Sequence, residues 1–184
     1  MRYIRTPIGS ATAFALGAVK AHARITATDE DPDLYTMAGA AVAEIEARTD
    51  LALVAQVITA TFDAWGDIVA LPVAPFYAGG LADHPVTVQL RDLDGNLTAH
   101  PAGWWIEAGL WPVLHLPTRA TGDALIVTYP AGFGAGPSDM PADLQAAIND
   151  QATQSYDLRG ADKGAQGLSL QASRIVARYK RVRL

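Results

Sequence analysis

The sequence predicts an α+β fold: a small core of about three helices, an antiparallel β region inserted between the second and third helices, and an extended C-terminal tail. Apolar residues recur at helical spacing up to about residue 50 and again after Pro141. Between these stretches, from Gln56 to Tyr129, short alternating runs are separated by proline, glycine and Asp-Gly turns. In a chain of 184 residues this pattern fits a single domain over residues 1–160, followed by a tail.

The helices differ in how strongly the sequence specifies them. The first is short and contains Gly17, so it needs tertiary support. The second has Asp31 as N-cap, Pro32 at its first position and an apolar stripe from Leu34 to Ile45. The helices are expected over about residues 14–25, 32–50 and 139–159.

A glycine-rich turn, Gly132 to Gly136, connects the last predicted strand to the third helix. It lacks the lysine of a Walker phosphate loop and the spacing of a dinucleotide fingerprint, and Pro137 interrupts the approach to the helix. We therefore interpret it as a turn that acts as a hinge between the layers. Ser138 or Asp139 is expected to cap the helix, with Pro141 in its first turn.

The β region, about residues 56–129, contains seven short runs with strand character. Asp94-Gly95 is a strong hairpin signal, because Asp-Gly supplies positive φ at low cost. We expect an antiparallel meander or a small sandwich. The predicted strands are residues 57–62, 68–71, 86–91, 97–99, 104–106, 113–116 and 124–129.

Residues 161–184 are expected to form a flexible linker and a basic C-terminal docking arm. The net charge is −5; because the segment from Arg174 onward has five bases and no acid, the residues before it carry −10. The arm is either a short helix, with Ile175 and Tyr179 one turn apart, or extended. Its mixture of apolar and basic residues favours docking over free solvation.

The sequence offers no catalytic or metal-binding constellation. There is no cysteine, and no histidine has a ligand partner at metal-site spacing. Asp83-His84 lacks a serine in a nucleophile setting, and the acidic run from Asp29 to Asp33 lacks the spacing of a calcium loop. The histidines are His22, His84, His100 and His115.

The N-terminal 23 residues imitate a secretory signal, with basic residues first and an A-x-A triplet at 21–23. Pro7 and Gly9 shorten the apolar stretch, and Lys20 lies just before the triplet, so we expect no signal peptide. No apolar run approaches the ~18 residues of a membrane span.

Four groups of residues form an ordered motif set over about residues 15–160. This set resembles the motifs of tailed-phage head-to-tail connector (adaptor) proteins, including the adaptors of phage-like gene transfer particles. The sequence departs from that family at Ala23, where the family has leucine, and in a tryptophan-rich segment over residues 103–112. The motifs are LGAVKAHARI at 16–25, RTDL at 48–51, Gln56 with LPVAP at 71–75, and YPAGFG at 129–134 with MPADLQAAI at 140–148.

The resemblance implies a structural virion protein that is not an enzyme and carries no cofactor. Such a protein forms a homo-oligomeric ring of twelve subunits under the portal protein, in the neck of a virion or phage-like particle assembled in the bacterial cytoplasm, without membrane contact. The ring joins the DNA-filled head to the stopper or tail-terminator protein. Double-stranded DNA passes through its lumen without specific binding, which an acidic body suits because it lacks phosphate-neutralising bases.

Two sets of residues are expected to make the contacts of such a ring. A flexible basic arm can order on binding the portal, and small-residue helix faces suit close packing between subunits. The expected portal-docking residues are Arg174, Ile175, Arg178, Tyr179, Lys180, Arg181, Arg183 and Leu184. The expected ring-packing residues are Lys20, Arg24, Leu144 and Ile148.

An alternative function is a nucleic-acid-binding module that uses the basic tail. Trp104, Trp105 and Trp111 could stack on bases in such a module, although core and interface packing is their commoner use. Salt-sensitive DNA binding would distinguish this function from a connector.

Overall fold

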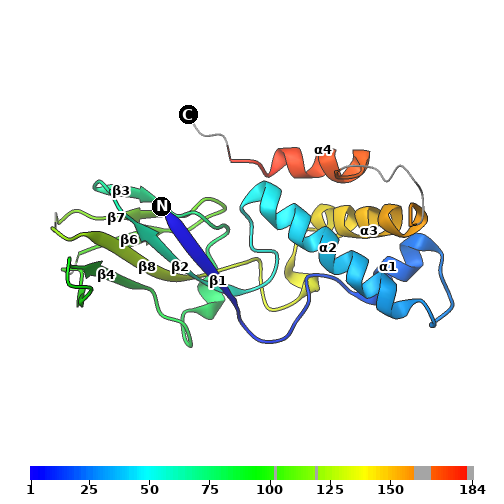
Figure 1. Ribbon diagram of the computed structural model, residues 1–184, viewed down its shortest axis with the longest axis horizontal. Helices are drawn as coiled ribbons and strands as arrows, with labels where there is room; N and C mark the ends of the chain where they lie inside the picture. The colour runs from blue at the N-terminus through cyan, green and yellow to red at the C-terminus, as the bar shows by residue number, and fades with distance from the viewer. Residues whose placement is uncertain (102, 119, 160–166, 182–184) are drawn as a thin grey trace. The chain divides into compact units, whose positions relative to one another are not determined.

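The computed structural model describes residues 1–101, 103–118, 120–159 and 167–181. These residues contain both α-helices and antiparallel sheets, which confirms the α+β class. The chain divides into two compact units, each built from two separate segments. A β unit comprises Met1–Ser10 and Ala55–Gly134, and a helical unit comprises Ala11–Val54 and Ala135–Leu184 (Figure 1).

The helical unit is organised around its third helix, which contacts each of the other three helices of the described residues. Its buried residues include Leu144 and Ile148, both fully buried, together with Leu34 and Ile45 of the second helix. The helices are α1 (Leu16–Ala23), α2 (Asp31–Thr49), α3 (Ala142–Asp157) and α4 (Leu170–Arg178).

The starts of α2 and α3 differ from the predicted ones. Asp31 is the first residue of α2 and makes no capping bond there, because its carboxylate accepts a 2.5 Å hydrogen bond from Lys20 Nζ. The α3 helix begins at Ala142 and not at residue 139, since residues 137–139 form a short 3-10 turn. In that turn Asp139 accepts a hydrogen bond from the Gly136 N–H at 3.1 Å.

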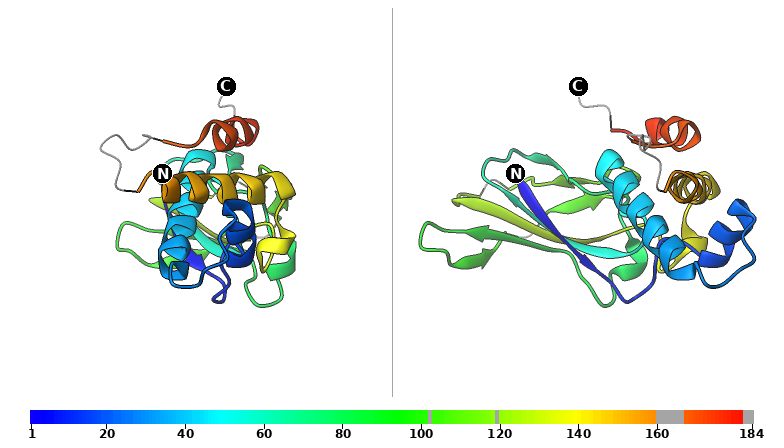
Figure 2. Two further views of the ribbon diagram at one scale, coloured as in Figure 1. Left: turned by 90° about the vertical axis from the view of Figure 1, so that its right-hand side faces the viewer. Right: turned by 45° about the vertical axis from the view of Figure 1, so that its right-hand side comes forward.

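The structure decides between the two alternatives for the tail, a short helix or an extended arm: residues 170–178 form a helix. Ala172, Ile175 and Val176 form one buried face of α4, and burying that face favours the helix over an extended arm. Both views of the helical unit show α4 lying along α3 (Figures 1 and 2). The predicted linker falls almost entirely on residues outside the described part of the chain.

The β unit contains two antiparallel sheets and not a single meander. The larger has the order β1-β2-β8-β4-β5 and the smaller the order β3-β7-β6. The main pairing joins β2 to β8, with Gln56 opposite Ala131 and Phe62 opposite Leu125. The strands are β1 (Arg2–Pro7), β2 (Gln56–Phe62), β3 (Ile68–Ala70), β4 (Thr87–Arg91), β5 (Leu97–Ala99), β6 (Trp105–Glu107), β7 (Val113–His115) and β8 (Ala124–Ala131).

The first strand was not predicted. Its six residues pair antiparallel with β2, from Arg2 opposite Thr61 to Pro7 opposite Gln56. Proline at the end of the run and basic residues within it are unfavourable strand signals, yet all are tolerated on an edge strand. Sequence pattern alone cannot supply the β2 edge that makes this segment a strand.

The glycine-rich turn lies where the chain passes from the β unit to the helical unit, between Gly134 and Ala135. Gly132 has a φ of 135°, a region that favours glycine. Its N–H donates to Pro75 O at 2.9 Å, and Gly134 O accepts from the Ala55 N–H at 2.8 Å. These bonds fix the end of the β unit at the turn.

A fully buried tyrosine ties the larger sheet to the segment that follows β3. The Tyr129 hydroxyl donates to Val73 O at 2.9 Å and accepts from the Val73 N–H at 3.0 Å. The Tyr129 hydroxyl therefore provides a hydrogen-bond partner for both the N–H and the C=O of the buried Val73.

We predict that Tyr129→Phe lowers the free energy of unfolding by about 1–3 kcal/mol, because it removes both partners of Val73. Urea denaturation followed by fluorescence measures the change. Tyr3→Phe, on the exposed strand β1, is the matched control and is expected to change stability by less than about 0.5 kcal/mol. Equal effects of the two substitutions would contradict the role of the Tyr129 hydroxyl.

Candidate functional site

The C-terminal helix α4 presents a basic surface on an apolar base. Ile175, which we expected to dock on a portal, is 8% exposed and belongs to the buried face of the helix. Arg174, Arg178 and Lys180 are exposed, and Arg181 is half-buried. From Gly167 to Arg181 the chain contains no acidic residue. The expected docking residues Arg183 and Leu184 lie outside the described residues.

The first turn of α4 is anchored through Ser169. Its hydroxyl accepts a hydrogen bond from the Ala172 N–H at 3.0 Å, which is an N-cap. The same hydroxyl donates to the Asp150 carboxylate at 2.5 Å, and the Ser169 N–H donates to Gln151 Oε1 at 2.6 Å. His22 Nε2 of α1 lies 3.7 Å from the other Asp150 oxygen, so Asp150 links three helices.

The last turn of α4 is anchored through Asp143 at the start of α3. The Arg178 guanidinium and the Tyr179 hydroxyl each donate to its carboxylate at 2.9 Å. Burial raises the pKa of Tyr179 to about 12, and the hydrogen bond to Asp143 adds to the shift. Because Asp143 meets the end of α4 and Asp150 meets its beginning, the two helices run antiparallel.

These contacts divide the basic residues into two groups. Arg178 has its charge offset by Asp143, whereas Arg174 and Lys180 extend their charges from the surface. An open groove of about 600 Å³ runs between α3 and α4, lined mostly by polar residues that include Arg174, Asp150 and Gln154. Because Asp150 and Asp157 both line this groove, the groove itself is not basic, and the exposed charges of Arg174 and Lys180 are the part of the surface suited to an acidic partner.

The four expected ring-packing residues occupy different environments. Leu144 and Ile148 pack inside their own helical unit and are 0% exposed. Lys20 is held by Asp31. Arg24 is exposed and ends α1 in the left-handed conformation, with a φ of 58°. Of the four, Arg24 alone is fully exposed on the surface of the unit.

A second polar cluster, which was not predicted, joins the loop before α2 to the end of α3. The Tyr156 hydroxyl and the Arg159 guanidinium both donate to the Glu30 carboxylate. These bonds, that of Tyr156 first, hold the pKa of Glu30 below its usual range. The Arg159 guanidinium lies 4.0 Å from the centre of the Tyr156 ring. Sequence separation of more than 120 residues hides such a cluster from pattern reasoning.

The histidines do not converge on a reactive centre. In the described ranges, no group of three or more His, Asp or Glu residues is placed to hold a metal ion. His100 is buried and bonds Pro101 O, and His115 stacks on Trp105 with ring centres 4.7 Å apart. None of the helices described is long and apolar enough to cross a membrane.

Comparison with known proteins identifies a structural class. No protein-family model matches the chain, and no curated protein matches it. Solved structures do match along the whole chain. A chain from the neck of an empty gene transfer agent (GTA) particle, computed with C6 symmetry, has a TM-score of 0.80 and 29% sequence identity. The match covers 100% of this chain and 97% of that one.

Two further structures give the same result with the same coverage. A chain from the virion of a native gene transfer agent particle has a TM-score of 0.79 and 27% identity. A chain from the neck of a native GTA particle, computed with C12 symmetry, has a TM-score of 0.77 and 29% identity. Fold and comparisons together define a component of a particle neck. The resemblance to proteins of phage-like gene transfer particles is thereby confirmed, and the chain groups with chains from the necks of these particles.

We predict that Ser169→Ala loosens α4 from its first turn. Loss of the N-cap costs about 0.5–2 kcal/mol, so the amide protection of α4 should fall by about tenfold. Hydrogen exchange of the α4 backbone amides measures this loss of protection. Ser173→Ala, in the middle of the same helix, is the control and should leave protection unchanged or higher, because alanine favours helix.

The Tyr179 contact is predicted to fail at high pH. The folded protein favours the neutral phenol, so the contribution is fully present below pH ~10, the usual tyrosine value. It is lost as the pH rises from there through about 12. The absorbance at 295 nm of the wild type minus that of Tyr179→Phe isolates this titration. A midpoint near 10 would contradict the contact.

Proposed function

We propose that the protein is a head-tail connector (adaptor) of a phage-like particle. In this role twelve copies form a ring under the portal and join the DNA-filled head to the stopper or tail-terminator protein. The supporting observation is the similarity of the whole chain, both units included, to chains from two necks and one virion of gene transfer agent particles, at TM-scores of 0.77–0.80. Particle necks computed with C6 and C12 symmetry are the setting expected for a ring of six or twelve.

The described residues also favour a structural role over catalysis. The conspicuous polar clusters, at Asp143, Asp150 and Glu30, each tie helices of one unit together. Their carboxylates are engaged by tyrosine, serine and arginine side chains, which is a packing arrangement and not a site open to a substrate. The same proposal places the protein in the neck of the particle, where double-stranded DNA passes through the lumen of the ring without being bound.

Portal docking is assigned to the exposed bases of α4 and of the residues directly after it. Arg174 and Lys180 carry charge outward, while Ile175 and Tyr179 support the helix that presents them. Arg178 and Arg181 border this surface. A helix already docked on α3 loses less conformational entropy on binding than a free arm would.

The test is negative-stain imaging of the protein mixed with the portal of the same particle. We expect added density beneath the portal ring for the wild type. The double variant Arg174→Glu, Lys180→Glu should lose it, because reversed charges repel an acidic partner surface. Deleting the tail is a poorer test, since it would expose the apolar surface under Ala172, Ile175 and Val176.

Arg48→Glu, one charge reversal of the same kind at an exposed residue of α2, is the control and should dock normally. Wild-type protein that stays apart from the portal would refute the connector proposal. Docking by the double variant would refute only the assignment to α4. Salt-sensitive DNA binding by the isolated protein, lost in the same double variant, would instead support the nucleic-acid-binding alternative.

A further inference from the structure

The five-stranded sheet of the β unit has two open edges. Its order places β1 at one edge and β5 at the other, and within the described part of the chain no strand pairs with the outer side of either. Both edges belong to one compact unit, so their separation is fixed by the sheet itself. Four strand intervals of about 4.8 Å place them roughly 19 Å apart.

The β1 edge is apolar and basic. Five of its six residues are exposed. Ile4 is 68% exposed and Tyr3 37%. Arg2 and Arg5 are the charged residues of the strand, and Asp63 lies 3.8 Å from Arg2 and partly offsets it.

The opposite edge is apolar and acidic. The hairpin between β4 and β5 exposes Leu93 (90%) and Leu97 (51%) beside Asp92 and Asp94. No basic residue occurs from residue 92 to residue 99.

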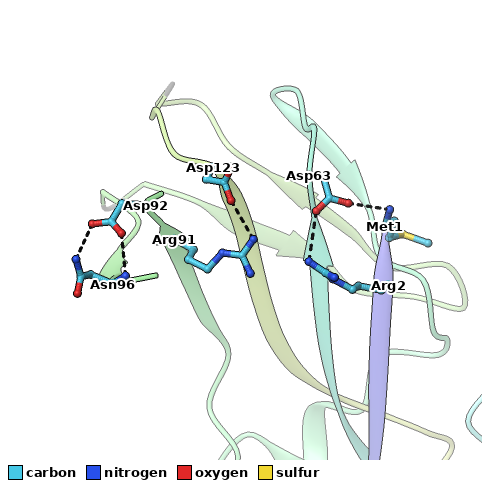
Figure 3. A network of polar contacts seen from close by, with 7 residues as sticks. All are labelled: Met1, Arg2, Asp63, Arg91, Asp92, Asn96 and Asp123. Carbon is cyan, nitrogen blue, oxygen red and sulfur yellow. Dashed lines mark hydrogen bonds and ion pairs between the residues drawn. The ribbon is translucent and has the colours of Figure 1, made fainter. Parts of the chain in front are cut away.

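Hydrogen bonds fix the acidic turn in place. Asp92 accepts from the backbone and side-chain N–H groups of Asn96 at 2.8 and 2.9 Å, which hold the pKa of Asp92 low. Arg91 is occupied by Asp123 at 3.0 Å, so it does not neutralise the turn. Figure 3 shows these pairs, and those of Asp63, at one end of the sheet.

Charged edge strands are often a device against aggregation. That explanation accounts for Arg2 and Arg5, but it does not account for exposed isoleucine, tyrosine and leucine side chains between the charges. A solvated edge would carry polar residues at these positions. Apolar centres with oppositely charged surroundings are instead typical of two surfaces that fit each other.

We propose that the β1 edge of one copy of this protein contacts the β4–β5 hairpin of the next copy, so that the sheets of neighbouring copies adjoin around a ring. This inference rests on the proposed function for the ring itself. The contact is head-to-tail, because two β1 edges would bring arginines together and two hairpins would bring aspartates together. A closed ring requires such a pair of different, complementary surfaces.

The strands of the sheet limit the kind of contact. Every neighbouring pair in the five-stranded sheet is antiparallel, so β1 and β5 have the same sense along the sheet. A twist of about 20–25° per strand pair accumulates over the four intervals, so the two edges are inclined to each other. The contact between copies is therefore made by exposed side chains of the β1 edge and the hairpin, and not by a backbone ladder between them.

Cysteine cross-linking tests the contact directly, because the chain has no cysteine of its own. The double variant Ile4→Cys, Leu97→Cys is assembled with the portal and treated with a short bis-maleimide. Its two thiols are at least roughly 19 Å apart within one copy, because the edge strands have that separation and the register also offsets the two positions along the strands, so a short linker can join them only between copies. We expect a ladder of covalent multimers. Ile68→Cys, Leu97→Cys is the matched control, since Ile68 is 67% exposed on β3 of the other sheet, and should give no ladder.

Charge insertion gives a second readout. Ile4→Glu should lower the yield of rings by at least about tenfold, because it places a carboxylate in the apolar centre opposite an acidic hairpin. Ile68→Glu is expected to assemble like the wild type. Both residues are exposed, so neither substitution should unfold the protein.

The outcomes separate the two proposals. Three results would each overturn the edge contact and leave the connector role intact. They are rings on the portal without a ladder, equal ring yields for Ile4→Glu and Ile68→Glu, and cross-linked dimers from Ile4→Cys alone. A ladder without any portal density would support the edge contact and refute the connector role. If the cysteine variant gives no covalent multimers and the wild type gives no density beneath the portal, the edge contact and the connector role are both refuted.

Discussion

The chain passes between the β unit and the helical unit at three points, and the two backbone hydrogen bonds of Ala55 hold these points together. The Ala55 N–H donates to Gly134 O at 2.8 Å, and Ala55 O accepts from the Ile8 N–H at 2.9 Å. These residues stand at or near the end of each segment of the β unit that continues into helices. Because β1, β2 and β8 are adjacent in the sheet, their ends meet here, and Ala55 itself is buried. The pairing of β1, β2 and β8 thus brings the three connections to the helical unit together at the ends of these strands.

Local pattern was enough to predict the strands from residue 56 onward, because alternation, Pro stops and the Asp-Gly hairpin are properties of a few adjacent residues. The pairing of the strands was not predictable. The strands β2 and β8 stand at opposite ends of the inserted region in the sequence, and only their contact in the folded chain makes them neighbours in a sheet. The β1 strand shows the same limit more sharply. Its sequence has the charges and proline of an edge, and it resembles a targeting segment until the β2 edge is known. The helix α4 was one of two alternatives for the same reason, since its apolar face is evident only when α3 is there to cover it.

Several of the expected contact residues are buried inside their own unit, so they support the fold and do not lie on its surface. Leu144 and Ile148 have the apolar character that suits contact between subunits, but α3 is the central helix of its own unit and buries them internally. Their effect on a ring would come through the shape of the unit. Ile175 and Tyr179 act in the same way for α4, whereas Arg174 and Lys180 keep their charges outside. Asp143, which lies within a motif for helix initiation, was not expected to select which bases stay exposed, yet it does so by engaging Arg178 and Tyr179.

Axial and lateral contacts in a ring make different demands on a subunit. A lateral contact is repeated around the ring, so a small error in the angle between its two surfaces accumulates and prevents closure. The two edges of one hydrogen-bonded sheet meet this demand, because the ladder between them fixes their relative direction. Their angle also does not depend on the placement of the helical unit. An axial contact has no such closure condition and tolerates a surface carried on a separate helix. The division of the chain into a sheet with complementary edges and a helical unit with a basic surface therefore gives each kind of contact the rigidity that it requires.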